Sequence, residues 1–147
     1  MIAVRRSAAL VAVVAGLMWS SAAAALVSLP AFHSPSGNIR CFFVRGTLRC
    51  SIAHADYAAA LQARCIAPPT ELDWHGFELG TRAKGMVTCS GGILYDSDTE
   101  RPSYVNLPYG RSWHHGAFTC RSRRTGVTCT NALGHGLFLS RQAWRAW

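Results

Sequence analysis

The sequence predicts an all-β fold, namely a small disulfide-stapled sandwich or barrel of short antiparallel strands and hairpins. Two observations carry this prediction. Strand-length apolar runs recur at close, fairly regular spacing between glycine, proline, serine and aspartate residues, which is typical of all-β domains. In addition, Cys41/Cys50 and Cys120/Cys129 repeat one spacing inside segments with the pattern of β-hairpins.

The first hairpin is expected from strands over 39–44 and 47–52, joined by a two-residue turn at 45–46. Counting outward from that turn makes Cys41 and Cys50 a pair that is not hydrogen-bonded. Side chains in such pairs approach closely, which suits the short Cβ separation of a disulfide. The sequence therefore predicts a bridge between these two cysteines.

The same count pairs Cys120 with Cys129 in the second hairpin, around a turn at 124–125. Gly126 could instead belong to a longer, bulged turn, which would shift the register by one residue. If both hairpin bridges form, Cys65 pairs with Cys89 by elimination.

One short helix is expected near 56–64, with Asp56 as its N-cap and two prolines after it. The tail 141–147 is expected to add one helical turn. The strands expected between the helix and the tail lie over 77–79, 85–89, 93–95, 104–107, 117–120, 127–130 and 136–139.

The first 25 residues have the layout of a secretory signal peptide. Two arginines precede an apolar run over 8–19, and small residues in A-x-A frames follow up to Ala25. Residues 26–147 are then expected to form a single exported β domain, secreted or periplasmic by the general secretory route. An uncleaved anchor is the alternative, because apolar and small residues continue to Leu29.

Two sequence blocks are specific: Ser-Pro-Ser-Gly-Asn-Ile-x-Cys at 34–41 and Gly-Val-Thr-Cys-Thr-Asn at 126–131. The segment Leu107-Pro108-Tyr109-Gly110 and the pair Ser140-Arg141 accompany them. From about residue 32 to residue 141 the chain resembles an uncharacterised family of small exported bacterial proteins with a domain of unknown function. The resemblance implies a secreted, disulfide-bonded protein and supplies no mechanism.

Positive charge is the main clue to a binding site. The chain carries a formal net charge of +8, and removal of the two signal-peptide arginines leaves +6. Arginines beside exposed aromatic side chains suit phosphate, uronate or other acidic groups. A solvated basic hairpin tip in an arginine-rich chain is the alternative. The candidate anion-binding residues are Arg111, Trp113, Arg121, Arg123 and Arg124.

The sequence carries no enzyme signature such as G-x-S-x-G, H-E-x-x-H or a phosphate-cradling glycine loop. It has no C-x-x-C pair, and pairing all six cysteines leaves no thiol for catalysis or metal binding. We therefore expect no catalytic residue, cofactor or metal. The prediction is an exported, non-enzymatic binding module whose partner is an acidic envelope polymer or an exported protein. The alternative is a small envelope hydrolase that uses histidine and the carboxylates of 71–78 and 96–100.

Overall fold

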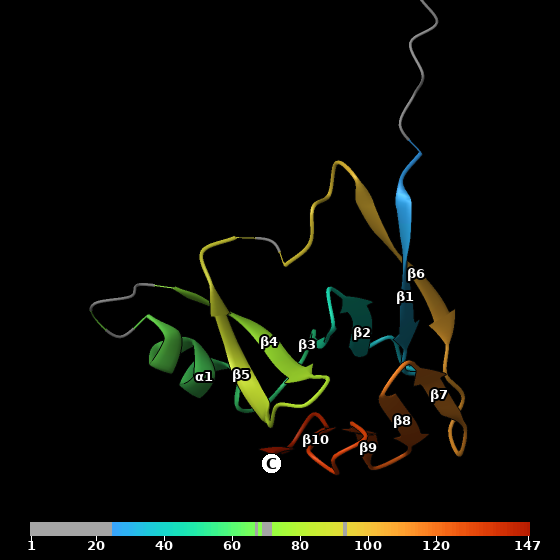
Figure 1. Cartoon of the computed structure of the whole chain (residues 1–147). Helices are drawn as coiled ribbons and strands as arrows, with labels where there is room; N and C mark the ends of the chain where they lie inside the picture. Colours follow the sequence, from blue (N-terminus) through green and yellow to red (C-terminus); the bar gives the residue numbers. More distant parts are fainter. Residues whose placement is uncertain (1–24, 67, 69–71, 93) are drawn as a thin grey trace, which may run out of the picture.

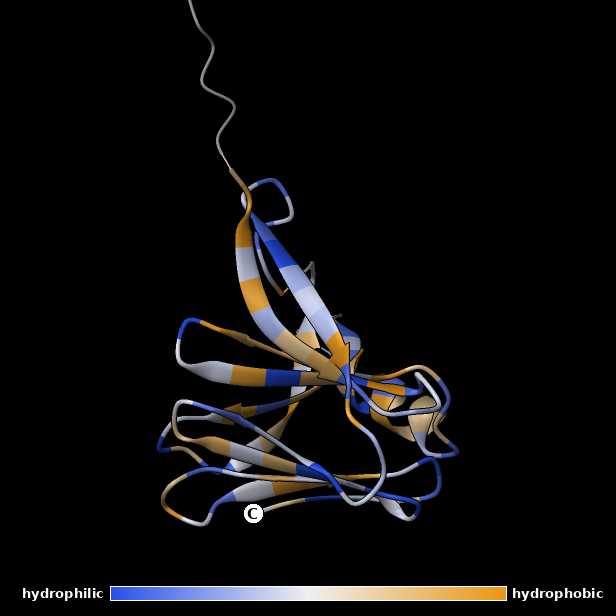
Figure 2. Cartoon of the chain, turned by 90° about the vertical axis from the view of Figure 1, so that its right-hand side faces the viewer, coloured by the Kyte–Doolittle hydropathy of each residue, from blue (hydrophilic) through white to orange (hydrophobic). Residues whose placement is uncertain are grey.

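The computed structural model describes residues 25–66, 68, 72–92 and 94–147, so the predicted signal peptide lies outside the described residues except for Ala25. The described chain forms two β-sheets, which lie one above the other in Figure 2, together with one short helix. This confirms the predicted all-β, disulfide-stapled fold. The elements are β1 (Val27–His33), β2 (Ile39–Val44), β3 (Thr47–Ile52), α1 (Ala58–Cys65), β4 (Asp73–Gly80), β5 (Gly85–Ser90), β6 (Glu100–Asn106), β7 (Ser112–His115), β8 (Phe118–Arg123), β9 (Gly126–Thr130), β10 (Gly136–Leu139) and β11 (Trp144–Ala146).

The six-stranded sheet has the order β5-β4-β3-β2-β1-β6, and the five-stranded sheet has the order β11-β10-β9-β8-β7. All neighbouring strands are antiparallel except β1 and β6, which are parallel and run side by side in Figure 1. The sequence predicted only antiparallel strands. The difference arises because the chain leaves β5 at one edge of the sheet and crosses to the other edge before β6 begins.

The first hairpin forms as predicted. Arg45 and Gly46 both have positive φ angles, of 48° and 78°, as a two-residue type I′ turn requires. Cys41 then lies directly opposite Cys50, and the two form a disulfide. The turn residues and the cysteine spacing thus act together to fix the register.

The second hairpin has the register of a two-residue turn, because Arg123 lies opposite Gly126. The longer, bulged turn that would shift this register does not form. The third bridge joins the end of α1 to β5. The three disulfides are Cys41–Cys50, Cys65–Cys89 and Cys120–Cys129, the pairing that the sequence predicts.

The hydrophobic core lies between the two sheets. The sulfur atoms of Cys41, Cys50 and Cys129 lie within 4.8 Å of one another, so the two hairpin disulfides meet across this core. Burial of the large apolar side chains around them drives the packing of the sheets. The largest fully buried apolar side chains are Phe32, Phe77, Phe118, Leu48, Leu79, Leu137 and Leu139.

The helix α1 differs from the prediction at its start. Its N-cap is Tyr57, which makes no capping hydrogen bond with its side chain. Asp56, the predicted N-cap, forms an ion pair with Arg141 instead, and its backbone N–H donates to the Arg141 carbonyl. The contacts of Asp56 with Arg141 thus outweigh its preference for capping the helix. Among the described residues, no helix has the length and apolar character needed to cross a membrane.

The strand predicted over 93–95 is wrong for the residues that the structure describes there. Ile93 lies outside the described residues, and Leu94 and Tyr95 belong to no strand. Both side chains pack against a second apolar cluster on the outer face of the six-stranded sheet. The ring centroids of Tyr95 and Phe42 are 5.3 Å apart there. Leu94 and Tyr95 are therefore apolar because they belong to a loop that covers the sheet, and not because they form a strand.

The tail forms β11 and not the predicted helical turn. Trp144 packs against the core, with its ring centroid 5.2 Å from that of Phe77. The backbone groups of Trp147 bond in both directions with those of Gly136, which extends the pairing of β10 and β11. Tertiary contacts thus hold the tail extended.

Candidate functional site

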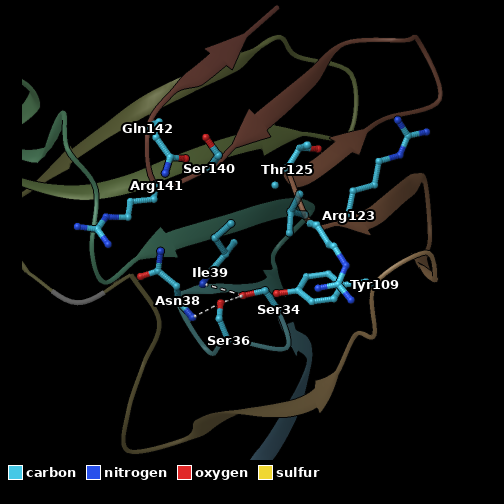
Figure 3. A pocket seen from close by; sticks show the side chains of 13 residues that line it. Ser34, Ser36, Asn38, Ile39, Tyr109, Arg123, Thr125, Ser140, Arg141 and Gln142 are labelled. Carbon is cyan, nitrogen blue, oxygen red and sulfur yellow. Dashed lines mark hydrogen bonds between the residues drawn. The ribbon is translucent and has the colours of Figure 1, made fainter.

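A groove of about 200 Å³ lies where the turn after β1, the tip of the β8–β9 hairpin and the turn after β10 meet (Figure 3). Ser34 and Tyr109 lie on one side of it, and Thr125 and Ser140 lie on the opposite side. The groove thus joins segments that are far apart in the sequence. Its side chains come from Ser34, Ser36, Asn38, Ile39, Tyr109, Arg123, Arg124, Thr125, Val127, Ser140, Arg141 and Gln142.

The turn after β1 is a rigid wall of this groove. The Ser34 hydroxyl accepts a hydrogen bond from the Ile39 N–H at 3.1 Å and lies 3.2 Å from the Ser36 hydroxyl. Asn38 fixes the other side of the turn, because its Oδ1 accepts from the His54 N–H and its Nδ2 donates to the His54 carbonyl. The turn therefore keeps its shape without help from a ligand.

Arg124 and Tyr109 form the cationic part of the groove. The Arg124 guanidinium carbon lies 5.2 Å from the centroid of the Tyr109 ring, within the range of a cation–π interaction. Tyr109 is 42% exposed and Arg124 is exposed as well, so both groups remain open to solvent. The ring orients the guanidinium but does not neutralise it, and the N–H donors stay available for an anion.

Arg141 lies at the other end of the groove. Its Nε is 3.2 Å from Asp56 Oδ1, and the two side chains are 66% and 57% exposed. An exposed pair of this kind is worth little, at most about 1 kcal/mol. A second hollow, lined by His54, continues from this end and shares Ser36, Asn38 and Arg141 with the groove. An acidic ligand could therefore compete with Asp56 for Arg141.

The structure brings together two of the five predicted anion-binding residues. Arg123 and Arg124 line the groove, whereas Arg111 and Arg121 do not. Arg121 is exposed on β8, and Arg111 is exposed in the connection before β7. Trp113 packs against the core, with its ring 5.0 Å from that of Phe32. Trp113 is therefore half-buried and does not line the groove, because strand alternation turns this side chain inward.

Charge is divided unevenly along the chain. All seven acidic residues lie at or before Glu100, so no carboxylate side chain occurs from residue 101 onward. None of the residues that line the groove is acidic. The five-stranded sheet and its turns are consequently cationic. The arginines from residue 101 onward are Arg101, Arg111, Arg121, Arg123, Arg124, Arg141 and Arg145.

The carboxylates considered for a hydrolase are engaged in local structure. Glu78 pairs with Arg49 at 2.9 Å, and Glu100 pairs with Arg45 at 3.0 Å. Hydrogen bonds from the Thr99 side chain and then from the backbone N–H of Asp98 lower the pKa of Asp96. Such a carboxyl stays ionised and does not suit a general acid. Glu71 lies outside the described residues.

Most of the groove residues were missing from the predicted set, including the four residues Ser36, Asn38, Tyr109 and Arg141. Each of these four belongs to one of the sequence blocks on which the family resemblance rests. Those blocks are distant in the sequence, and only the packing of the sheets shows that they meet.

Comparisons with models of protein families, with curated proteins and with solved structures find no match to this chain.

Proposed function

We propose that this protein is an exported, non-enzymatic binding module whose groove holds an acidic group of an envelope polymer. The observation that carries the proposal is the Arg124 guanidinium held over Tyr109 in a groove whose lining residues include no carboxylate. Arg123 and Arg141 add positive charge around it. A carboxylate or phosphate in this position would accept hydrogen bonds from Arg124, which are strong because both partners are charged.

The groove is suited to binding and not to chemical conversion. Its polar residues are arginines, serines, a tyrosine, a threonine and amides, and it has no base paired with a nucleophile. The hydroxyl of Ser34 is held by the turn itself. Positive charge without a neighbouring carboxylate would attract an acidic polymer over a distance, and this attraction weakens as salt screens it.

Binding to polygalacturonate, with neutral dextran as the reference polymer, tests the proposal. We expect the oxidised full-length protein to bind polygalacturonate, with an affinity that falls as salt is raised. Arg124→Gln should weaken this binding about tenfold, the effect of losing one hydrogen bond between charged groups. Arg82→Gln is the matched control, because Arg82 is an exposed arginine in the β4–β5 turn and does not line the groove.

Two results would contradict the binding proposal. One is equal binding of polygalacturonate and dextran. The other is an equal effect of the Arg124 and Arg82 substitutions, because general positive charge would then explain the binding as well as the groove does. Circular dichroism of each variant checks that the fold is intact.

Export is the second part of the proposal, and three disulfides support it, because such bonds persist in oxidising compartments. The intact mass of protein recovered from the exported fraction is the test. We expect the mass of residues 25–147 or 26–147 with six hydrogens fewer than the reduced form. Free thiols or a retained N-terminal segment would contradict this part of the proposal.

A further inference from the structure

We propose that the ligand is an extended acidic polysaccharide, which continues from the groove onto the outer face of the five-stranded sheet. This inference rests on the proposed function and adds a second subsite to it. Arg123 connects the two places, because it lines the groove and also points outward from β8, as Arg121 does two residues earlier.

Register places a row of side chains across this outer face. Pairing runs from Ser112 on β7 through the successive strands to Arg145 on β11. Neighbouring strands are about 4.8 Å apart, so Arg121 on β8 and Arg145 on β11 are separated by roughly 14 Å. The members of the row are Ser112, Arg121, Thr128, Phe138 and Arg145.

Two aromatic rings lie against the backbone of this face because glycines leave room for them. A Cβ atom added to Gly126 would lie 2.9 Å from Cε2 of Phe138, so no larger residue fits beneath this ring. A Cβ atom added to Gly136 would likewise collide with the indole of Trp147. The indole N–H donates to the Gly134 carbonyl at 2.8 Å, which fixes the ring in place.

Arg145 lies beside both rings. Its guanidinium carbon is 5.7 Å from the centroid of Phe138 and 5.9 Å from that of Trp147. Arg121, Arg123 and Arg145 take part in none of the ion pairs found among the described residues. The strands β7 to β11 contain no acidic residue. This face therefore combines free guanidinium groups with fixed aromatic surfaces.

The order of groups along the row favours a polysaccharide with carboxylates. Arg121, Thr128, Phe138 and Arg145 offer in turn a cation, a hydroxyl, a ring and a second cation. A polymer of uronic acids presents carboxylates, hydroxyl groups and the apolar faces of its rings to match them. The separation of about 14 Å between the arginines exceeds what a single sugar spans. A single-stranded nucleic acid would instead stack its bases on more open aromatic side chains.

Oligogalacturonates of one, three and six units test this inference, with the full-length oxidised protein and isothermal titration calorimetry. We expect the hexamer to bind at least tenfold more tightly than the monomer. Arg145→Gln should lower the affinity for the hexamer about fivefold to tenfold and leave that for the monomer unchanged. Arg124→Gln should lower the affinity for both, because it changes the groove itself. Arg82→Gln is the control for net charge, and Trp147→Ala provides a second test of the outer face.

The possible failures are distinguishable. If no oligomer binds at any length, the proposed function itself falls. If binding depends on Arg124 but not on chain length or on Arg145, the groove stands and the second subsite is overturned. If a single-stranded hexanucleotide binds more tightly than the hexamer and this binding depends on Arg145, the assignment of a polysaccharide is overturned.

Discussion

Ser122 offers a sharp test of the energetics of this fold. Its side chain is 0% exposed on β8, and its hydroxyl has no hydrogen-bond partner among the described residues. Burial of a hydroxyl without a partner costs about 1–3 kcal/mol. Removing the oxygen in Ser122→Ala removes this cost and leaves only a small void. We therefore expect the free energy of unfolding to rise by about 1 kcal/mol.

Ser140 provides the matched control for this substitution. It is also buried, but its hydroxyl donates to the Ala143 carbonyl and accepts from the Ala143 N–H, both at 3.0 Å. Ser140→Ala should therefore lower the free energy of unfolding by about 1–2 kcal/mol. The same chemical change is expected to have opposite signs at the two positions. Only the hydrogen bonds of the serine decide the sign.

Urea denaturation followed by tryptophan fluorescence, with the disulfides intact, measures both variants against the natural protein. Equal m-values would show that the substitutions change stability and not the compactness of either state. The reasoning is refuted if Ser122→Ala destabilises the protein as much as Ser140→Ala does. The hydroxyl of Ser122 would then have a favourable partner, such as an ordered water.

Two further predictions concern ionisation and the disulfides. Burial raises the pKa of Tyr57 to about 12, so the unfolded chain, with an ordinary pKa near 10, loses this proton first. The free energy of unfolding should therefore fall as the pH rises from about 10 to about 12. Rapid urea titrations should show that this fall is about 1 kcal/mol smaller in Tyr57→Phe, which has no phenol proton to lose. Replacing Cys65 and Cys89 by alanine should lower the free energy of unfolding by about 3.4 kcal/mol, and replacing Cys120 and Cys129 should lower it by about 2.6 kcal/mol. The loss is larger for the first pair because the Cys65–Cys89 bridge closes the longer loop. Equal losses at the urea midpoints would contradict the entropic argument.

The local parts of the fold could be predicted from the sequence. The β2–β3 hairpin follows from a turn that tolerates positive φ and from cysteines at matching distances on both sides. Once both hairpins are placed, only one pairing remains for Cys65 and Cys89. Each of these steps depends on residues close together in the sequence.

The long-range parts could not be predicted in this way. Pairing of β6 with β1 depends on where the chain returns after β5, which local patterns do not record. The groove is of the same kind, because Tyr109 and Arg141 reach it from separate loops. Trp113 shows the converse: it is close to arginines in sequence, yet alternation along β7 turns its ring toward Phe32 and away from the groove.

The placement of the disulfides has a consequence for assembly. Cys41–Cys50 and Cys65–Cys89 both close within residues 25–106, and Cys120–Cys129 closes within the five-stranded sheet. In the part of the chain that the structure describes, the main chain at 107–111 is therefore the only covalent link between the two sheets, which otherwise hold together by packing and hydrogen bonds. Two oxidised molecules can exchange their five-stranded sheets and rebuild the same core without breaking a sulfur–sulfur bond. Domain swapping is thus open to this protein even where its disulfides cannot be reduced.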